Sequence, residues 1–276
     1  MTLGVKVRVN HMMTGQDQMA QPHKGMRNAE IAELAQKANS VPAFQSAQDR
    51  LGLSRKLGLL CDAFVADDND LRHALIRRMK QDGIDASDIV DYIVPETARL
   101  LGERWRADDI TFADVTIGAA RLQEAVHALT ARQTHRARCG MGRILMVVPR
   151  PEYHTLGAFI ATDQMRRIGH VVDIAVDMDP GAVVTLIQQH SYAMIGISAS
   201  ARRSLAYTTE MVERLRSSVR RTIPVVLGGG VLNLDLDLVG ITGVTHVAAD
   251  VEAALKMSGL PVVKSRSIPI SEFEAT

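Results

Sequence analysis

The chain has 276 residues, of which 46% are hydrophobic and 23% are charged. These values are typical of a globular chain with one large or two medium domains, and they exclude a chain that is disordered throughout. The formal net charge is +1 and the pI is about 7.9, so overall charge gives no reason to expect nucleic acid or an anionic membrane as the main partner.

The cysteines and the N-terminal residues bear on the compartment. Cys61 and Cys139 are the two cysteines and lie far apart, which argues against a zinc site or a disulfide framework and is typical of a reducing compartment. The opening residues lack the apolar core of a signal peptide, and no segment has the apolar length of a membrane span. We therefore expect a cytoplasmic protein without membrane contacts.

Residues 1–50 are polar, rich in Gln and Met, and weakly periodic. This composition predicts a mobile N-terminal tail, with one short helix near residues 29–39. The segment is too short for a folded DNA-binding module and a linker. We therefore expect no direct sequence-specific DNA binding.

Residues 51–133 have the periodicity of a helical bundle. Asn69 or Asp70 is expected to cap the second helix, and the third is expected to open at Ser87 and to kink at Pro95. Apolar residues recur every three or four positions in four successive stretches, which predicts four helices around one core. The stretches contain Leu53, Leu57, Leu60 and Phe64; Leu71, Ala74, Leu75 and Met79; Ile89, Ile93, Leu100 and Leu101; and Val115, Ala119, Leu122, Val126 and Leu129.

A basic segment that contains glycines, residues 134–143, is typical of a linker, and the period changes after it. Short apolar runs rich in β-branched residues alternate with amphipathic stretches, which predicts a flavodoxin-like, doubly wound sheet of five parallel strands over residues 143–260. The expected fold class is therefore α + α/β, a four-helix bundle followed by this sheet, with a C-terminal tail at 261–276. The expected strands are 144–148, 171–176, 193–198, 223–229 and 244–248, and the expected helices are 158–168, 181–190, 204–219 and 251–257.

Three loops at the carboxyl ends of the predicted strands are chemically distinctive. His154 follows the first strand in the stretch VVPRPEYHTLG, Ser198–Ser200 ends the third, and Gly228–Gly230 ends the fourth. Ligands of doubly wound sheets bind beyond the carboxyl ends of the strands. Small hydroxyls and glycines on neighbouring strand ends are expected to leave a slot for a flat group, since glycine has no Cβ to fill it.

Residues 143–258 resemble the cobalamin-binding domain that methionine synthase, corrinoid proteins and cobalamin-dependent photoreceptors share. The signature of that family is DxHxxG, then SxL, then GG; this chain has Glu152, His154 and Gly157, then Ser198 and Ser200, then Gly228, Gly229 and Gly230. The helical bundle resembles the cap that precedes such domains, where a tryptophan follows a short glycine-containing pattern. Here that tryptophan is Trp105.

The resemblance implies the cofactor and its ligands. Cobalamin, as the adenosyl or hydroxo form, would bind with its nucleotide tail withdrawn from cobalt and placed in the slot between the Ser198 and Gly228 loops. His154 would be the lower axial metal ligand, and Glu152 would bond its second nitrogen in a relay that Ser204 extends. Gly157 would let the loop turn under the corrin. Trp105 would shield the upper face.

The chain also departs from the family pattern. Glu152 replaces the usual aspartate, and Ser200 replaces the leucine of SxL. Related photoreceptors carry a Glu-His pair after the tryptophan, where this chain has Val115 and Thr116. The motif therefore supplies no upper histidine ligand from the bundle.

Each feature also has a plainer interpretation. A histidine in a loop is commonly a solvated or capping residue, and a run of glycines is often a turn or a phosphate cradle. Trp105 taken alone fits the core of the bundle. The coincidence of three loops favours the cofactor site over these alternatives.

The order of tail, bundle and cobalamin domain looks most like the AerR/PpaA antirepressors of purple photosynthetic bacteria. This resemblance implies a non-enzymatic, light-responsive transcriptional regulator whose partner is a CrtJ/PpsR type repressor of photosynthesis genes. Two other functions remain open. One is a corrinoid methyl-carrier subunit that serves a separate methyltransferase, and the other is a redox sensor that binds haem through His154.

Overall fold

The computed structural model describes residues 47–131, 141–150, 152–219 and 222–262, with side chains from Lys56 onward. The bundle contains α2 (Ala47–Val65), α3 (Asn69–Gln81), a third helix in three consecutive parts, and α6 (Phe112–Thr130). The third helix consists of α4 (Ala86–Asp88), the π-helical turn η1 (Ile89–Ile93) and α5 (Val94–Arg106). The four predicted helices are thus present, while the expected tail helix at 29–39 and nearly all of the linker lie outside the described residues.

Three predicted helix starts were wrong by a few residues. The helix α2 begins at Ala47 rather than Leu51, so the proposed tail ends earlier. The cap of α3 is Asp68, whose extended backbone lets its carboxylate accept from Leu71 N–H at 2.8 Å; the expected Asn69 and Asp70 already lie inside the helix. The third helix opens one residue before Ser87, with Asp85 in the cap position.

Pro95 changes the type of helix. It has no N–H to donate, and the chain accommodates this with the π-turn η1 immediately before it, where Val94 N–H bonds Ile89 C=O five residues back. The kink that was expected at Pro95 stays a prediction, and the observed change is this π-turn.

The helices α5 and α6 approach closely at Gly118. A Cβ at this glycine would lie 2.9 Å from Leu101 Cδ1, so the apolar stripe of α6 passes through Gly118, whereas the expected core residue Ala119 is exposed. The helix α3 lies at the edge of the bundle, because it has no fully buried residue and its Leu71 is 42% exposed. The periodicity therefore identified α3 as a helix but overestimated its burial.

The start of α6 is fixed by a capping box. Thr111 Oγ1 accepts from Asp114 N–H at 3.1 Å, and Asp114 Oδ2 accepts from Thr111 N–H at 2.8 Å. We expect Thr111→Ala to lower the free energy of unfolding by about 1 kcal/mol in urea denaturation. Thr116→Ala removes an exposed hydroxyl within the same helix and should lower the free energy of unfolding clearly less. Equal losses in the two variants would show that the capping box does not stabilise the helix.

The α/β part forms one parallel sheet with strand order β2-β1-β3-β4-β5, which confirms the flavodoxin-like prediction. Two short elements after β4, the 3-10 helix η2 and α10, were not predicted because their segment alternates Leu with polar residues without a helical period. In chain order the elements are β1 (Arg143–Val148), α7 (Leu156–Ile168), β2 (Val171–Val176), α8 (Pro180–Gln189), β3 (Met194–Ser198), α9 (Arg203–Ser218), β4 (Val225–Gly228), η2 (Gly230–Asn233), α10 (Leu238–Thr242), β5 (His246–Val247) and α11 (Val251–Met257).

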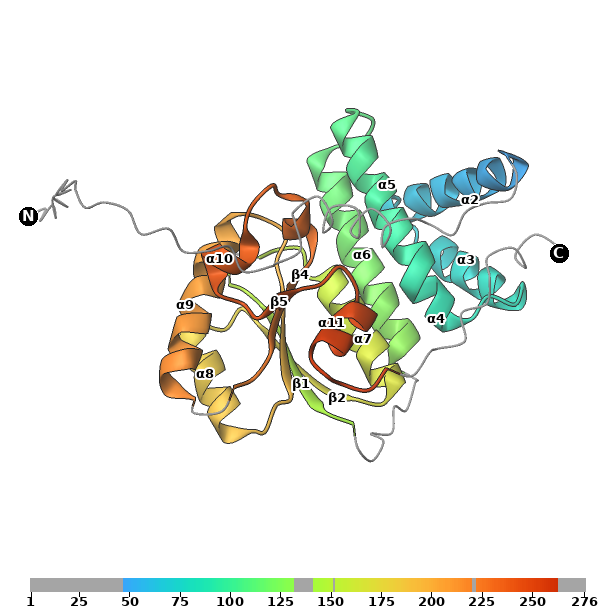
Figure 1. The fold of residues 1–276 in the computed structure, drawn as a ribbon. Coiled ribbons are helices and arrows are strands. Elements are labelled where there is room, and N and C mark those ends of the chain that lie inside the picture. The colour runs from blue at the N-terminus through green and yellow to red at the C-terminus, as the bar shows by residue number, and fades with distance from the viewer. Residues whose placement is uncertain (1–46, 132–140, 151, 220–221, 263–276) are drawn as a thin grey trace, which may run out of the picture.

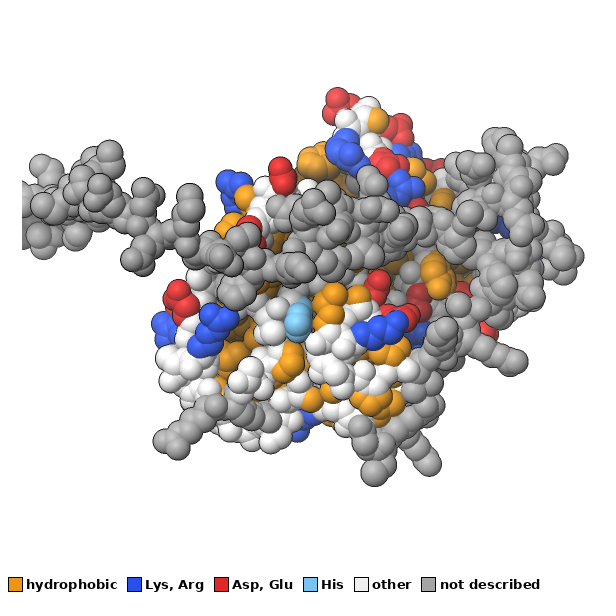
Figure 2. Space-filling view, viewed as in Figure 1, with side chains coloured by type: hydrophobic (Ala, Val, Ile, Leu, Met, Phe, Trp, Pro, Cys, Tyr) orange, Lys and Arg blue, Asp and Glu red, His pale blue; other side chains and the backbone are white. Residues whose placement is uncertain are grey.

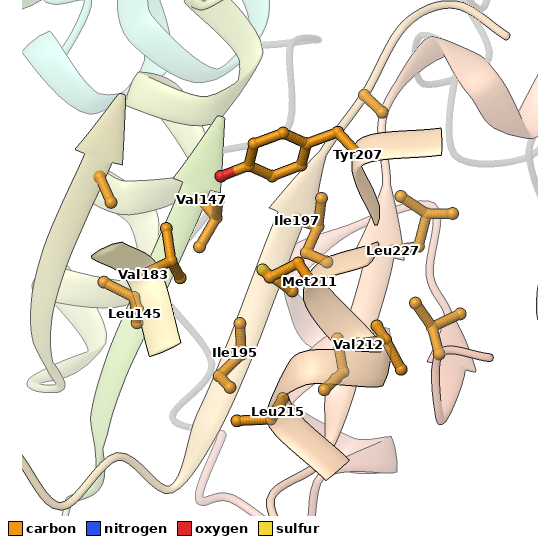
Figure 3. Packing of buried hydrophobic residues seen from close by; sticks show 14 of the residues in the cluster. Leu145, Val147, Val183, Ile195, Ile197, Tyr207, Met211, Val212, Leu215 and Leu227 are labelled. Carbon is orange, nitrogen blue, oxygen red and sulfur yellow. The ribbon is translucent and has the colours of Figure 1, made fainter. Parts of the chain in front are cut away.

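Helices cover both faces of the sheet (Figure 1). One face packs against α8, α9 and α10 through a large aliphatic cluster, in which Ile195 and Ile197 of β3 meet Met211 and Leu215 of α9 (Figure 3). The other face packs against α7 and α11, with Met146 and Met194 in its cluster. Arg143, expected in the solvated linker, instead opens β1 and pairs with Asp173 of β2 at 2.7 Å.

The bundle rests on the α/β domain through α7. The helices α6 and α7 pack side by side, and Ile160 of α7 belongs to the bundle core. Edge-to-face contact joins the rings of His127 and Phe159, with centroids 4.7 Å apart. The helix α7, which follows the His154 loop, is therefore also the helix against which the bundle packs.

Candidate cofactor site

The His154 loop joins the carboxyl end of β1 to the start of α7. After Pro149 the chain turns, with Glu152 N–H bonded to Pro149 C=O at 2.9 Å. The two candidate side chains differ in burial: Glu152 is 5% exposed, whereas the side chain of His154 is 74% exposed.

Glu152 receives hydrogen bonds on both carboxylate oxygens. Oε1 accepts from His154 N–H at 2.9 Å, from the Ser200 hydroxyl at 2.7 Å and from His154 Nδ1 at 3.0 Å. Oε2 accepts from Ser200 N–H at 2.6 Å and from the Ser204 hydroxyl at 3.1 Å. The carboxylate therefore ties the first loop of the sheet to the loop after β3 and to the first turn of α9.

These bonds keep Glu152 ionised. Burial alone would raise the pKa of Glu152, but the donors from His154 and Ser200 outweigh it and lower the pKa to about 2. A buried carboxylate that is charged at neutral pH stabilises a proton on the nitrogen beside it. It is a suitable anchor for one orientation and one tautomer of the His154 ring.

The expected hydrogen bond between Glu152 and His154 is present, and so is the extension to Ser204. Because a carboxylate only accepts, the neutral ring carries its proton on Nδ1, and Nε2 keeps the lone pair that a metal needs. His154 is exposed while its orienting partner is buried, so the imidazole is positioned before any ligand arrives. The ligand role itself stays a prediction.

Ser200 is the residue whose role the sequence did not disclose. It was noted as a departure from the leucine of the family motif, yet its N–H and hydroxyl both bind Glu152, and its Oγ lies 2.9 Å from His154 Nδ1. Its offset of two from Ser198 places it just beyond the end of β3. Glutamate is one methylene longer than aspartate, and Ser200 supplies the donors that fix the longer side chain.

A slot for the nucleotide tail was expected between the Ser198 and Gly228 loops, and it stays a prediction. The two loops touch: Ala199 N–H bonds Gly228 C=O at 3.0 Å, and Val231 N–H bonds Ala199 C=O at 3.1 Å. Gly229 has φ +95°, and a Cβ on it would lie 2.5 Å from Ala199 O, so this glycine serves loop packing rather than an opening.

Three small residues lie on one face of the sheet, the face toward α7 and α11. Neighbouring atoms cover two of them: a Cβ on Gly196 would lie 3.2 Å from Met146 Cε, and a Cβ on Gly228 would lie 3.0 Å from Ala248 O. Side chains alternate along a strand, and Gly196, Ser198 and Gly228 share this face, with Ser198 paired to Gly228 in the sheet register. We call these three residues the small-residue strip. It runs from the middle of β3 to the carboxyl edge, where Gly157 is exposed at the start of α7.

Trp105 does not lie in the bundle core. It is 44% exposed and stacks at a tilt against Phe112, with ring centroids 5.9 Å apart, at the end of the bundle where α5 turns into α6. Figure 2 shows charged side chains of both signs around this tip, with apolar side chains among them. The core interpretation of Trp105 was therefore wrong, and the aromatic pair is free to contact a ligand or a partner.

Within the described ranges no group of three or more His, Cys, Asp or Glu residues could hold a bare metal ion. A single exposed, oriented imidazole fits a metal that brings its other ligands with it in a macrocycle. The oriented His154 imidazole at the carboxyl edge of the sheet fits such a metal. No helix in the same ranges has the length and hydropathy of a membrane span.

Comparison with known proteins relates the α/β domain to a known family. Residues 142–257 match the B12 binding domain family, the family that the motif predicted. A relative from Rhodobacter capsulatus, described as an uncharacterized 20.5 kDa protein in the bchF-crtJ intergenic region, is 29% identical over 176 residues, 62% of this chain and 91% of the relative. The monomethylamine corrinoid protein of Methanosarcina barkeri has the same fold, with a TM-score of 0.62 at 17% identity over 74% of this chain and 97% of that protein.

Proposed function

We propose that this protein binds cobalamin through His154 and acts as a light-responsive antirepressor that contacts a CrtJ/PpsR type repressor. The observation that carries the cofactor part is the exposed imidazole of His154, held by a buried, ionised Glu152 at the carboxyl edge of a B12-binding domain.

Each residue of the site has a role in this proposal. His154 Nε2 would ligate cobalt, while Glu152 fixes the ring and Ser200 and Ser204 fix Glu152. The exposed pair of Trp105 and Phe112 would be the part of the bundle that contacts the cofactor. A bound alkyl cobalamin would supply a cobalt–carbon bond that visible light breaks, and the bundle above the site is the element that can respond.

A regulatory role is supported by the description of one relative. The named location of the Rhodobacter relative, beside crtJ, supports a partner of the CrtJ/PpsR type. A ligand shifts a conformational equilibrium only if its affinities for the two conformations differ. The proposal therefore requires that the helical bundle contact the cofactor differently before and after the cobalt–carbon bond is broken.

The regulatory part is tested by copurification of the repressor with the full chain. The protein is loaded with adenosylcobalamin or hydroxocobalamin, and repressor capture is measured in darkness and after illumination. Capture that changes with light or cofactor form supports the proposal. Unchanged capture, or methyl transfer to a separate enzyme without repressor binding, contradicts it. A haem spectrum after purification from cells would instead favour the haem sensor.

We expect His154→Ala to weaken hydroxocobalamin binding by about 100-fold, since outer-shell partners of metal ligands alone are worth 10–100-fold. The absorption bands of histidine-ligated cobalt should also disappear. His73→Ala, an exposed histidine on α3, is the matched control and should bind as the unaltered chain does. Normal affinity and spectrum in the His154 variant would remove the axial-ligand assignment.

A further inference from the structure

Thr155 joins the His154 loop to the bundle by a hydrogen bond. It is at the N-cap position of α7, but its side chain makes no cap bond there. A threonine at this position normally accepts a hydrogen bond from the first turn of its own helix. Here the Thr155 hydroxyl instead donates to Gln123 Oε1 of α6 at 2.7 Å. The residue next to the proposed metal ligand therefore contacts the bundle in place of its own helix.

A second contact follows one turn later on both helices. The ring of His127 on α6 meets the ring of Phe159 on α7 edge to face, with centroids 4.7 Å apart. Residues four apart lie on one face of a helix, so His127 shares a face with Gln123, and Phe159 shares a face with Thr155. Because the two contacts follow each other in the same order on both helices, α6 and α7 run in the same direction here.

The N-terminal part of α6 projects beyond the start of α7. From Phe112 to Gln123 the helix rises about 16 Å before it reaches the first of these contacts. Since α7 begins at the His154 loop, this part of α6 lies beyond the carboxyl edge of the sheet (Figure 1). Thr116 and Ala120 are exposed along it. We call residues 112–120 the overhang.

The two ends of α7 hold the bundle with different strength. In the last turn, Arg167 pairs with Asp91 of the bundle, and both side chains are largely buried. At the start, the polar contact is the single neutral hydrogen bond between Thr155 and Gln123. Such a bond changes an equilibrium by about 3- to 10-fold, whereas breaking a buried ion pair changes it by a factor of about 100 or more. A group that displaces the overhang therefore breaks the bond at Thr155 first, and the bundle pivots about Arg167.

We propose that the Thr155–Gln123 hydrogen bond is the contact through which the form of the cofactor sets the position of the bundle. The bond stays intact when the face of the corrin away from His154 carries a small ligand such as hydroxide. It breaks when that face carries the adenosyl group, which takes the space under the overhang. This inference rests on the proposed cobalamin binding and adds how the two forms of the cofactor place the bundle differently.

The test measures the affinities of the full chain for adenosylcobalamin and hydroxocobalamin in darkness. Gln123→Leu keeps a side chain of similar size and removes the acceptor. It should strengthen adenosylcobalamin binding about 3- to 10-fold, because that form no longer has to break the bond, and it should leave hydroxocobalamin binding unchanged. Thr155→Val removes the donor and should change the ratio of the two affinities in the same way.

Conservative variants separate the hydrogen bond from the packing around it. Gln123→Glu keeps an acceptor and Thr155→Ser keeps a donor, so both should keep the affinity ratio of the unaltered chain. Gln188→Leu is the matched control, because it removes the bond from an exposed glutamine of α8 to Ser218 C=O, and it should also keep that ratio.

Hydrogen exchange measures the position of the overhang. In the unaltered chain, residues 112–120 should exchange faster with adenosylcobalamin bound than with hydroxocobalamin bound. In Gln123→Leu they should exchange fast with both forms, so that the difference disappears. Exchange in η1, which carries Asp91 at the pivot, should be the same with both forms.

The possible failures are distinct. If the unaltered chain binds neither form of cobalamin, the proposed function is wrong and the inference falls with it. If the chain binds both forms but Gln123→Leu and Thr155→Val leave the affinity ratio unchanged, or weaken both forms equally, the inference is wrong while cobalamin binding stands.

Discussion

Replacing Glu152 by glutamine should lower the free energy of unfolding by roughly 3 kcal/mol at pH 7, the value of a pKa held near 2 instead of 4.5. The folded-state pKa is depressed, so the stabilisation is fully present above pH 4.5 and is lost as the pH falls from 4.5 toward 2. The unaltered protein should therefore lose stability over this acid range, and the variant should lack that part of the loss. Urea denaturation at several pH values measures the difference directly.

The matched control is Glu213→Gln, an exposed glutamate on α9. It should change stability by less than about 0.5 kcal/mol at any of these pH values. In contrast, Glu152→Gln should also weaken hydroxocobalamin binding 10–100-fold, because the partner that orients His154 is altered. If the difference in stability between the Glu152 variant and the unaltered chain were the same at pH 2.5 and pH 7, ionisation of this carboxylate would not be its source.

The sheet was predictable because its strands are buried on both sides. Runs such as Ile144–Val148 lie between two helical layers and are therefore continuously apolar, which gave all five strands to within two residues at each end. The Glu152–His154 pair was predicted from the resemblance to the family motif. A ligating imidazole needs a partner for its second nitrogen, and Glu152 is the motif residue beside it.

Other features depend on contacts between distant residues, which spacing along one chain does not reveal. Ser200 was seen as a departure from a motif, but its role appears only when the loop after β3 meets Glu152, 48 residues earlier. The stripe of α6 shifts to Gly118 because Leu101 of α5 occupies the space beside it. The exposure of Trp105 could not be predicted either. The sequence shows an aromatic residue on a helix, but not whether another helix covers it.

Not every glycine at the carboxyl edge leaves open space. Glycines were expected to open space between two loops, whereas Gly229 lets the loops close on each other through its left-handed backbone. Gly196, in the middle of β3, is also closely packed, because a Cβ on it would lie 3.2 Å from Met146 Cε. Side chains of a strand point alternately to its two faces, and this alternation alone predicts that Gly196 and Ser198 share one face of the sheet.

Arg167→Met should be the most destabilising of the substitutions considered, at about 3–5 kcal/mol, because it removes a buried cation from between two carboxylates. Arg167 Nη2 lies 2.5 Å from Asp91 of η1, its Nε lies 2.8 Å from Asp163, and its side chain is only 13% exposed. Burial raises the pKa of Asp91, and the hydrogen bond from Arg167 opposes that rise, so loss of the arginine leaves Asp91 harder to ionise.

The cluster of Arg167, Asp91 and Asp163 joins the helical bundle to the α/β domain. Arg167 is near the end of α7, the helix that begins at the His154 loop, and Asp91 lies in the π-turn of the cap. In Arg167→Met, hydrogen exchange should therefore accelerate in α4 and η1 more than in the sheet. Arg214→Met, which breaks an exposed pair with Glu210, should cost less than about 1 kcal/mol and leave the cap unchanged. A double-mutant cycle with Asp91→Asn should show coupling of at least about 1 kcal/mol. If the losses of the two single variants simply added up in the double variant, the contacts between α6 and α7 alone would hold the helical bundle on the α/β domain.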